Sequence, residues 1–255
     1  MHNSQLGGVL WVMKKTSALR FLALALALAT VAAAATPARI LNDTAHGEGP
    51  HHPEMQALAK KHWLEISDSK AELTPELLAS VRLLYLRAPS TAFSEREKAA
   101  VIEFVRKGGA LLLVLDEDLR QSLAKTGVND LIAPFGVRLT GDLPYLHNRG
   151  GLAIAGEINA ANRELPYSGG RAVEGGMPFA FVLDREGKPA EAFATRVKVE
   201  GGGRIVVMGE GMASIFLGKP EGVRLTGKDR DAVGTVYWGK DSALFMDEVI
   251  AWLVK

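Results

Sequence analysis

The sequence predicts an α/β fold with a mostly parallel sheet and helices on both faces, and residues 81–117 carry this prediction. The apolar run 81–86 is short enough for a strand and too continuous for one with a solvent-exposed face. Ser94-Glu95-Arg96-Glu97 has the pattern of a capping box that starts a helix, and Gly108-Gly109 that of a helix stop. A second apolar run, 110–115, completes a strand–helix–strand unit of the length that a right-handed parallel crossover needs.

The remaining elements follow from the same patterns. Helices are expected to start near Pro53, Thr74 and Asp241, and a further helical stretch runs from residue 117 to Phe135. The polar turn 184–188 separates two strand-like runs, which predicts an antiparallel hairpin. Segments 141–176 and 217–239 show no regular pattern and are predicted to be functional loops or small subdomains. Further strands are predicted at 38–41, 63–66, 136–139, 179–184, 192–199 and 203–208.

Residues 1–35 have the order of a secretory signal peptide. Lys14, Lys15 and Arg20 precede the apolar run 21–28, and Ala33-Ala34-Ala35 offers a small-residue cleavage site. An uncleaved anchor is the alternative, although the apolar run is shorter than the roughly 20 residues that a membrane span needs. Met13 lies where a signal peptide would begin, so residues 1–12 are a candidate misassigned start. We therefore expect a periplasmic or secreted domain of residues 36–255.

Charge and cysteine content exclude several classes of function. The whole chain has 30 basic and 29 acidic residues, and residues 1–35 hold three of the basic ones, so residues 36–255 carry a formal charge of −2. No basic surface charge is predicted that would recruit nucleic acid. The sequence has no cysteine, which excludes disulfides, thiolate catalysis, cysteine-ligated metals and a lipidated N-terminal cysteine.

Four short motifs occur in the order found in a known superfamily. They are Asp43-x-x-His46-Gly47, the capping-box helix ending in Gly108-Gly109, the strand running into residues 209–212 (Gly-Glu-Gly-Met), and the terminal Ala-Trp-Leu of residues 251–253. Together they resemble the class I glutamine amidotransferase-like superfamily over Arg39 to Lys255. The most similar branch is the non-catalytic one, found in gliding and transporter-accessory proteins and in intraflagellar transport proteins.

The resemblance implies a flavodoxin-like sheet, here with an added antiparallel hairpin. It does not imply glutamine hydrolysis, because the superfamily's nucleophile is a cysteine at a strand-to-helix elbow and this chain has none. The corresponding strand ends in residues 115–119 (Leu-Asp-Glu-Asp-Leu), with no serine in the nucleophile's place.

A ligand site is expected beyond the carboxyl ends of the parallel strands, where ligands bind in open α/β sheets. The alternative is that these polar residues only satisfy the amides of their own loops. The predicted ligand-binding residues are Asp43, His46, Gly47, Glu48, Arg87, Glu210, Gly211 and Ser214.

Metal binding is a separate hypothesis. His46, His51 and His52 could ligate zinc, since imidazole suits that ion. Adjacent histidines at a helix start point about 100° apart, which disfavours one shared coordination sphere. We therefore expect no resident cofactor, with zinc as the alternative.

Other catalytic patterns are weaker. Ser214 lacks the Gly-x-Ser-x-Gly elbow, and Gly47 and Gly49 lack the lysine of a phosphate-binding loop. The acidic residues 116–118 fit either a glycosidase carboxylate pair or a helix N-terminus that favours negative charge. The two irregular segments carry side chains suited to a sugar or a protein partner, or to packing over the sheet edge: Tyr145, His147, Arg149, Arg163, Tyr167, Tyr237 and Trp238.

The predicted function is a non-catalytic domain that binds a small molecule or an envelope protein partner. Nucleic acid is not an expected partner, and a membrane is one only through an uncleaved signal segment. The first alternative is a hydrolase or sugar-processing enzyme that uses Asp43, His46 and Glu210, with or without a metal. The second is a purely structural member of an envelope complex, recognisable by a large exposed apolar patch.

Overall fold

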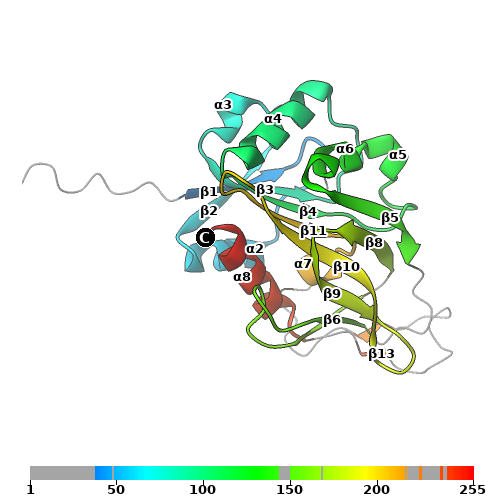
Figure 1. Ribbon diagram of the computed structural model, residues 1–255. Coiled ribbons are helices and arrows are strands. Elements are labelled where there is room, and N and C mark those ends of the chain that lie inside the picture. The colour runs from blue at the N-terminus through cyan, green and yellow to red at the C-terminus, as the bar shows by residue number, and fades with distance from the viewer. Residues whose placement is uncertain are drawn as a thin grey trace, which may run out of the picture. The chain divides into compact units, whose positions relative to one another are not determined.

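The computed structural model describes residues 38–47, 49–143, 150–167, 169–215, 217, 224–225, 236–237 and 240–255. Its main sheet has nine strands in the order β2-β1-β3-β4-β11-β10-β9-β6-β7 (Figure 1). The first five strands are parallel, and their order is that of a flavodoxin-like sheet. This confirms the predicted fold class. The five are β2 (Leu64–Ser69), β1 (Ala38–Asp43), β3 (Val81–Arg87), β4 (Ala110–Val114) and β11 (Arg204–Met208).

The other four strands extend the sheet in antiparallel fashion. The expected hairpin is present as β9 (Met177–Leu183) and β10 (Pro189–Lys198), and β10 pairs with β11. Segment 141–176, predicted to be irregular, instead contains β6 (Gly151–Ala153), β7 (Arg163–Leu165) and β8 (Gly170–Gly175). Strands of three residues are too short to show an alternating pattern, which is why the sequence did not reveal β6 and β7. Strand β8 pairs with β5 (Val137–Leu143) in a separate small sheet.

Helices cover both faces of the parallel strands, as predicted (Figure 1). Alternate residues of β3 divide between two cores: Leu83 and Tyr85 join one cluster, and Leu84 and Leu86 join the other. The first cluster includes buried residues of α2 (Pro53–Lys61) and α8 (Ser242–Leu253). The second includes residues of α3 (Pro75–Leu78) and α4 (Glu95–Arg106). A strand buried on both faces needs the continuous apolar run that the sequence has there.

The predicted helical stretch 117–135 is not one helix. It is divided into α5 (Leu123–Thr126), α6 (Val128–Ile132) and the 3-10 turn η1 (Ala133–Phe135). Gly127, at φ 64°, ends α5 in the left-handed conformation, and Pro134 lies in the 3-10 turn. The prediction of helical structure in this stretch is therefore confirmed, and the prediction of one continuous helix is wrong.

Short elements complete the description: α7 (Met212–Ile215), β12 (Arg224–Leu225) and β13 (Val236–Tyr237). None of the helices within the described ranges has the length and apolar character that a membrane crossing requires. The predicted signal peptide, residues 1–35, lies outside the described residues. So do Glu48, Tyr145, His147, Arg149, Trp238 and the side chain of Tyr237.

Candidate functional site

The strand order changes direction between β1 and β3, so the crevice beyond their carboxyl ends is where this fold offers a ligand site. Asp43 is the last residue of β1, and Arg87 is the last residue of β3. Both side chains are buried, with 2% and 8% of the residue surface exposed. The sequence therefore placed Asp43, His46 and Arg87 at the correct end of the sheet.

His46 lies between two carboxylates at this crevice. Its Nδ1 is 2.9 Å from Asp43 Oδ2, and its Nε2 is 3.4 Å from Glu97 Oε2. The ring stacks on Phe93, with 4.2 Å between the ring centroids. Glu97 comes from the start of α4 and also accepts hydrogen bonds from the backbone N–H groups of Ser94 and Leu73. The three titratable groups thus connect the loop after β1 to the capping box of α4.

The opposite charges of His46 and its neighbouring carboxylates shift the pKa values of His46 and Glu97 toward their charged forms. Burial by itself lowers the pKa of His46, but hydrogen bonds and attraction from Asp43 and Glu97 outweigh it and raise that pKa above 6.5. Burial raises the pKa of Glu97, while the backbone N–H bonds from Ser94 and Leu73 and the charge of His46 lower it overall. A protonated His46 between two carboxylates is the arrangement that these shifts favour.

The loop after β1 is held down over the crevice by Arg87. The Arg87 guanidinium donates to the carbonyl oxygens of Gly49 and Pro50, at 3.4 and 3.1 Å. Gly47 approaches the strand ends so closely that an added Cβ would lie 2.6 Å from Arg87 O and 2.8 Å from Asp43 O. A glycine is required here for packing against backbone, which explains Gly47 without a ligand.

The histidines proposed as zinc ligands have other contacts. His51 Nδ1 lies 2.9 Å from Asp68 Oδ1, and His52 is the N-cap of α2 without a side-chain capping bond. Both ring nitrogens of His46 face Asp43 and Glu97. The residues that the structure describes contain no group of three or more metal-ligating side chains. The geometry gives the zinc hypothesis no support.

The loop after β11 holds Glu210, Gly211 and Ser214, and it lies at a different place along the carboxyl ends of the strands. Strand β11 is three strand spacings from β1, about 14 Å at the usual interstrand distance. Ser214 is fully buried and donates from Oγ to Gly211 O at 2.7 Å, which leaves the hydroxyl engaged with its own turn. The predicted eight-residue pocket is therefore divided into two places.

A buried arginine that sequence reasoning missed organises the carboxyl end of β4. Arg171, on β8, is 1% exposed, and its Nε donates to Asp116 O at 2.6 Å. Its Nη2 donates to Gln121 O at 2.5 Å and to Asp118 Oδ1 at 2.9 Å. One side chain thereby fixes the loop between β4 and α5. The only sequence signal was an arginine within the segment that was predicted to be irregular.

The acidic residues 116–118 do not cap a helix N-terminus as a group. Asp118 accepts from the Leu123 N–H at the start of α5, but it also pairs with Arg171. Asp116 pairs with Arg120 at 3.0 Å. Burial raises the pKa of Asp116 above its ordinary value, although Arg120 and Arg171 oppose that shift. These carboxylates are tied to arginines, which does not favour the glycosidase hypothesis.

The aromatic and basic residues of the irregular segment pack inward where they are described. Tyr167 is fully buried and donates to Leu143 O at 3.2 Å. Burial, followed by the negative charge of Glu210, raises its pKa strongly. Arg163 forms an ion pair with Glu248 of α8 at 2.6 Å. Tyr167 and Arg163 are therefore parts of the fold.

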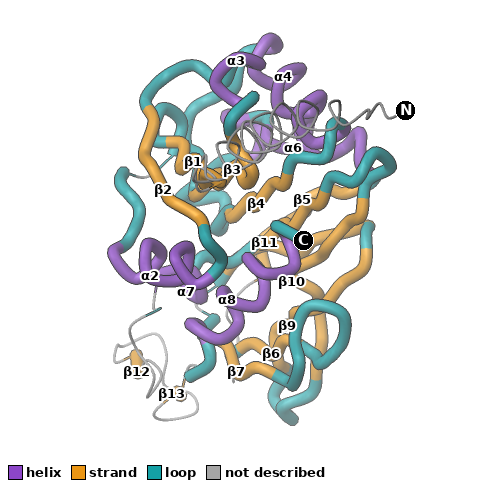
Figure 2. Tube along the Cα trace, turned by 90° about the vertical axis from the view of Figure 1, so that its left-hand side faces the viewer, coloured by secondary structure: helices purple, strands orange, loops and turns teal. Residues whose placement is uncertain are grey.

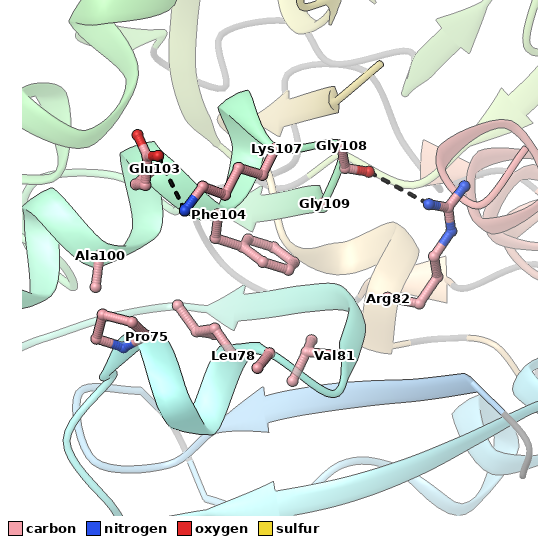
Figure 3. A pocket seen from close by; sticks show the side chains of 11 residues that line it. Pro75, Leu78, Val81, Arg82, Ala100, Glu103, Phe104, Lys107, Gly108 and Gly109 are labelled. Carbon is pink, nitrogen blue, oxygen red and sulfur yellow. Dashed lines mark hydrogen bonds and ion pairs between the residues drawn. The ribbon is translucent and has the colours of Figure 1, made fainter. Parts of the chain in front are cut away.

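Two hollows lie away from the carboxyl ends. One, of about 350 Å³, separates α3 from α4 beside the amino ends of β3 and β4, and Leu78, Val81 and Phe104 line it (Figure 3). Lys107 and Glu103 pair at its rim, and Arg82 donates to Gly108 O (Figure 3). The second hollow, of about 280 Å³, lies beside β2 and the exposed Trp63.

Comparison with known proteins finds one family model and several solved structures that are similar to this chain. Residues 49–149 match the family model of the IFT52 GIFT domain. The structure is similar to the mmIFT52 N-terminal domain, with a TM-score of 0.63, 18% identity, and coverage of 85% of this chain and 97% of that one. A putative ThuA-like protein from Bacteroides uniformis has a TM-score of 0.51 at 10% identity, with coverage of 88% and 94%. No curated protein matches the sequence.

These likenesses bear on the expectations from sequence in two ways. They confirm the predicted flavodoxin-like α/β fold. They contradict the predicted periplasmic or secreted location, because the family model and the TM-score 0.63 structure are both of IFT52, an intraflagellar transport protein. An apolar stretch after three basic residues was insufficient to establish export.

Proposed function

We propose that this chain is a non-catalytic domain of the amidotransferase-like fold whose function is to bind a protein partner. The likeness to the IFT52 GIFT domain, a domain of an intraflagellar transport protein, supports a role within a protein assembly. The absence of cysteine from the sequence excludes the superfamily's glutamine hydrolysis.

The observation that carries the proposal is how the crevice at the strand switch point is occupied. Asp43 and Glu97 both face His46, and Arg87 binds the carbonyl groups of the loop above it. The side chains that would recognise or activate a small molecule are used to hold the loop against the sheet. A protein-binding role needs no such crevice and can use the outer surface.

The hydrolase alternative has one observation in its favour, the Asp43–His46 pair at 2.9 Å. In a catalytic dyad the carboxylate orients one imidazole nitrogen, and the other nitrogen faces a nucleophile, a water or a metal. Here that second nitrogen faces Glu97. Glu210, the third member of the proposed cluster, follows β11, which is three strand spacings from β1, about 14 Å at the usual interstrand distance.

Two measurements test the proposal. The full chain is cross-linked to its neighbours in cells, and each captured protein is purified and recombined with it, with stoichiometry measured by light scattering. We expect a complex of defined stoichiometry that also forms with the His46→Gln variant. Turnover of glutamine, esters or aryl glycosides by the wild-type chain, lost in a His46→Gln variant that keeps its melting temperature, would overturn the proposal in favour of an enzyme.

A further inference from the structure

The two edge strands of the nine-stranded sheet, β7 and β2, differ in whether their outer backbone groups are hydrogen-bonded. At one end, the backbone of β7 is already paired: Glu164 N donates to Asp241 Oδ2 at 2.9 Å, and Asp241 N donates to Glu164 O at 3.1 Å. At the other end, β2 is the outermost strand and has six residues (Figure 2). An edge strand presents a row of backbone donors and acceptors that can pair with another chain. Among the residues that the structure describes, the sheet is closed at β7, and no strand pairs with the outer side of β2.

Trp63 stands directly before β2, at the end of α2. Its backbone N–H bonds back to Lys60 O at 3.2 Å, and its φ is 57°, in the left-handed region. A helix commonly ends with glycine at such a position, because a side chain is strained there. The indole is also 87% exposed. The fold gains little burial from this tryptophan and holds it in an unfavourable backbone conformation, and such residues concentrate at functional sites.

The hollow of about 280 Å³ connects Trp63 to the strand. Its walls come from the outer side of α2 and the first half of β2: Gln56, Lys60, Trp63, Leu64, Glu65 and Ile66. Leu64 and Ile66 are buried in the core, so the hollow runs along the strand edge and beside the indole. A side chain of an added strand would find a pocket there.

A second copy of this chain is a poor occupant. Pairing β2 with itself about a two-fold axis perpendicular to the sheet requires opposite residues to point to the same face. Centring on Glu65 or on Asp68 places two like carboxylates directly opposite each other, which is destabilising. Centring on Ile66 places Asp68 opposite Leu64, and centring on Ser67 places it opposite Ile66. Within β2, no register centred on residues 65–68 sets a basic residue opposite Glu65 or Asp68, and centring on Leu64 or Ser69 overlaps only one end of the strand.

Charge complementarity indicates a basic partner. Glu65 and Asp68 are exposed on β2, and Asp68 already accepts from Asn42 Nδ2 and from His51. A strand with arginine or lysine opposite Glu65 would form a cross-strand ion pair. An arginine side chain at the near end could also stack on the indole of Trp63. Lys60, in the same hollow, and Lys70, exposed just after β2, flank the two carboxylates and favour acidic residues only at the ends of the partner segment.

From these observations we propose that β2 and Trp63 form the docking surface for an extended, predominantly basic segment of a partner protein, which adds to the sheet as a further edge strand. This inference rests on the proposed protein-binding function and names the surface and the chemistry of the partner.

The test uses dye-labelled hexapeptides and the full chain, with affinity measured by fluorescence anisotropy at low and moderate salt. The probe is Lys-Val-Arg-Thr-Lys-Val. One control peptide, Glu-Val-Glu-Thr-Glu-Val, reverses the charge. The other, Lys-Pro-Arg-Pro-Lys-Pro, keeps the charge but cannot donate to a sheet ladder at its prolines. We expect the probe to bind at least about 5-fold more tightly than either control, because cross-strand pairs and backbone bonds both contribute.

Three variants locate the binding. Trp63→Ala is expected to weaken the probe about 3-fold, the size of one exposed cation–π contact, and Glu65→Lys about 10-fold, through charge reversal. Leu244→Ala, which removes a half-exposed leucine from α8, is the matched control and is expected to leave binding unchanged. Equal binding of the proline peptide, or equal loss in all three variants, would overturn the proposal.

The remaining outcomes separate this surface from the function on which it rests. If a partner captured in cells binds Trp63→Ala and Glu65→Lys as well as wild type, the surface is wrong and the protein-binding function stands. If the chain proves to be a hydrolase with no partner, the proposed function fails whatever the peptides do. Concentration-dependent dimerisation that Trp63→Ala abolishes, measured by sedimentation, would replace the basic partner with a second copy.

Discussion

The crevice at the strand switch point and the open edge at β2 differ in what their side chains contact. At the crevice, His46 faces two carboxylates and Arg87 binds loop carbonyls, so polar groups satisfy one another. At the edge, an exposed Trp63 occupies the left-handed position that ends α2, where glycine would be less strained. A cluster that resembles a catalytic site can thus serve folding, while function is better sought where a residue that costs stability has no structural role.

The largest effect is expected from Arg171→Ala. The change removes the donor for the buried carbonyl groups of Asp116 and Gln121 and leaves a cavity beneath the loop after β4. We expect a loss of about 3 kcal/mol in the free energy of unfolding, since unsatisfied buried acceptors cost about 1–3 kcal/mol each. Urea denaturation followed by circular dichroism measures it.

Arg138→Ala is the matched control for that variant. Arg138 lies on β5, which pairs with β8, but its ion pair with Glu174 is solvent-exposed on both sides. Its removal is expected to change stability by at most about 0.5 kcal/mol. If the two variants were equally mild, the carboxyl-end arginine would not be structural, and it would become a candidate ligand-binding group.

A smaller effect is expected from His46→Ala. The substitution leaves Asp43 and Glu97 buried without their shared partner, and we expect a loss of about 2 kcal/mol, within the range for a buried charged hydrogen bond. His52→Ala is the control, because His52 makes no side-chain capping bond, and thermal melts of both variants give the comparison. Unchanged stability in His46→Ala would reopen a catalytic role for this group.

The pH dependence of stability gives a further test of the same group. The pKa of His46 is raised above its unfolded value of 6.5, so its contribution is fully present below pH 6.5 and is lost as pH rises through the folded pKa. The pKa of Glu97 is lowered from 4.5, so its contribution is present above pH 4.5 and is lost as pH falls through the folded pKa. Stability is expected to be greatest between the two unfolded values.

Unfolding free energies measured from pH 4 to pH 9 show whether this window exists. In His46→Gln, the decline above pH 6.5 should disappear, because glutamine does not titrate. A decline of the same size in the variant would assign the pH dependence to another group.

Much of the fold could be predicted because its parallel strands are long and buried on both faces. The runs at β3 and β4 are continuous, and the capping box of α4 forms as Ser94 and Glu97 predict. Segment 141–176 could not be assigned because its strands β6 and β7 have three residues each. Periodicity needs several residues of one element, and these strands do not provide them.

The candidate site was predicted only in part, for a different physical reason. Asp43, His46 and Arg87 were placed at the strand ends by fold topology. Glu97 was recognised as part of a capping box, but the sequence does not show that its carboxylate also reaches His46. Trp63 was assigned to a strand, and neither its φ nor its exposure follows from local sequence. Such contacts depend on which distant segments the fold brings together.

The smallest expected effect is the stability difference between two variants of Trp63, which separates the exposure of the indole from the strain of its backbone. Trp63→Ala removes the indole but leaves a side chain in the left-handed region, whereas Trp63→Gly removes the indole and the strain together. We expect the glycine variant to be more stable than the alanine variant by about 1 kcal/mol, the lower end of the usual cost of a side chain in the left-handed region. Both variants should lose the same fraction of partner affinity, because affinity depends on the indole. If the glycine variant is more stable than wild type while it binds the partner less tightly, Trp63 is retained for binding at the expense of stability. If wild type is the most stable of the three, the indole has a structural role after all, and the difference between the crevice and the edge disappears.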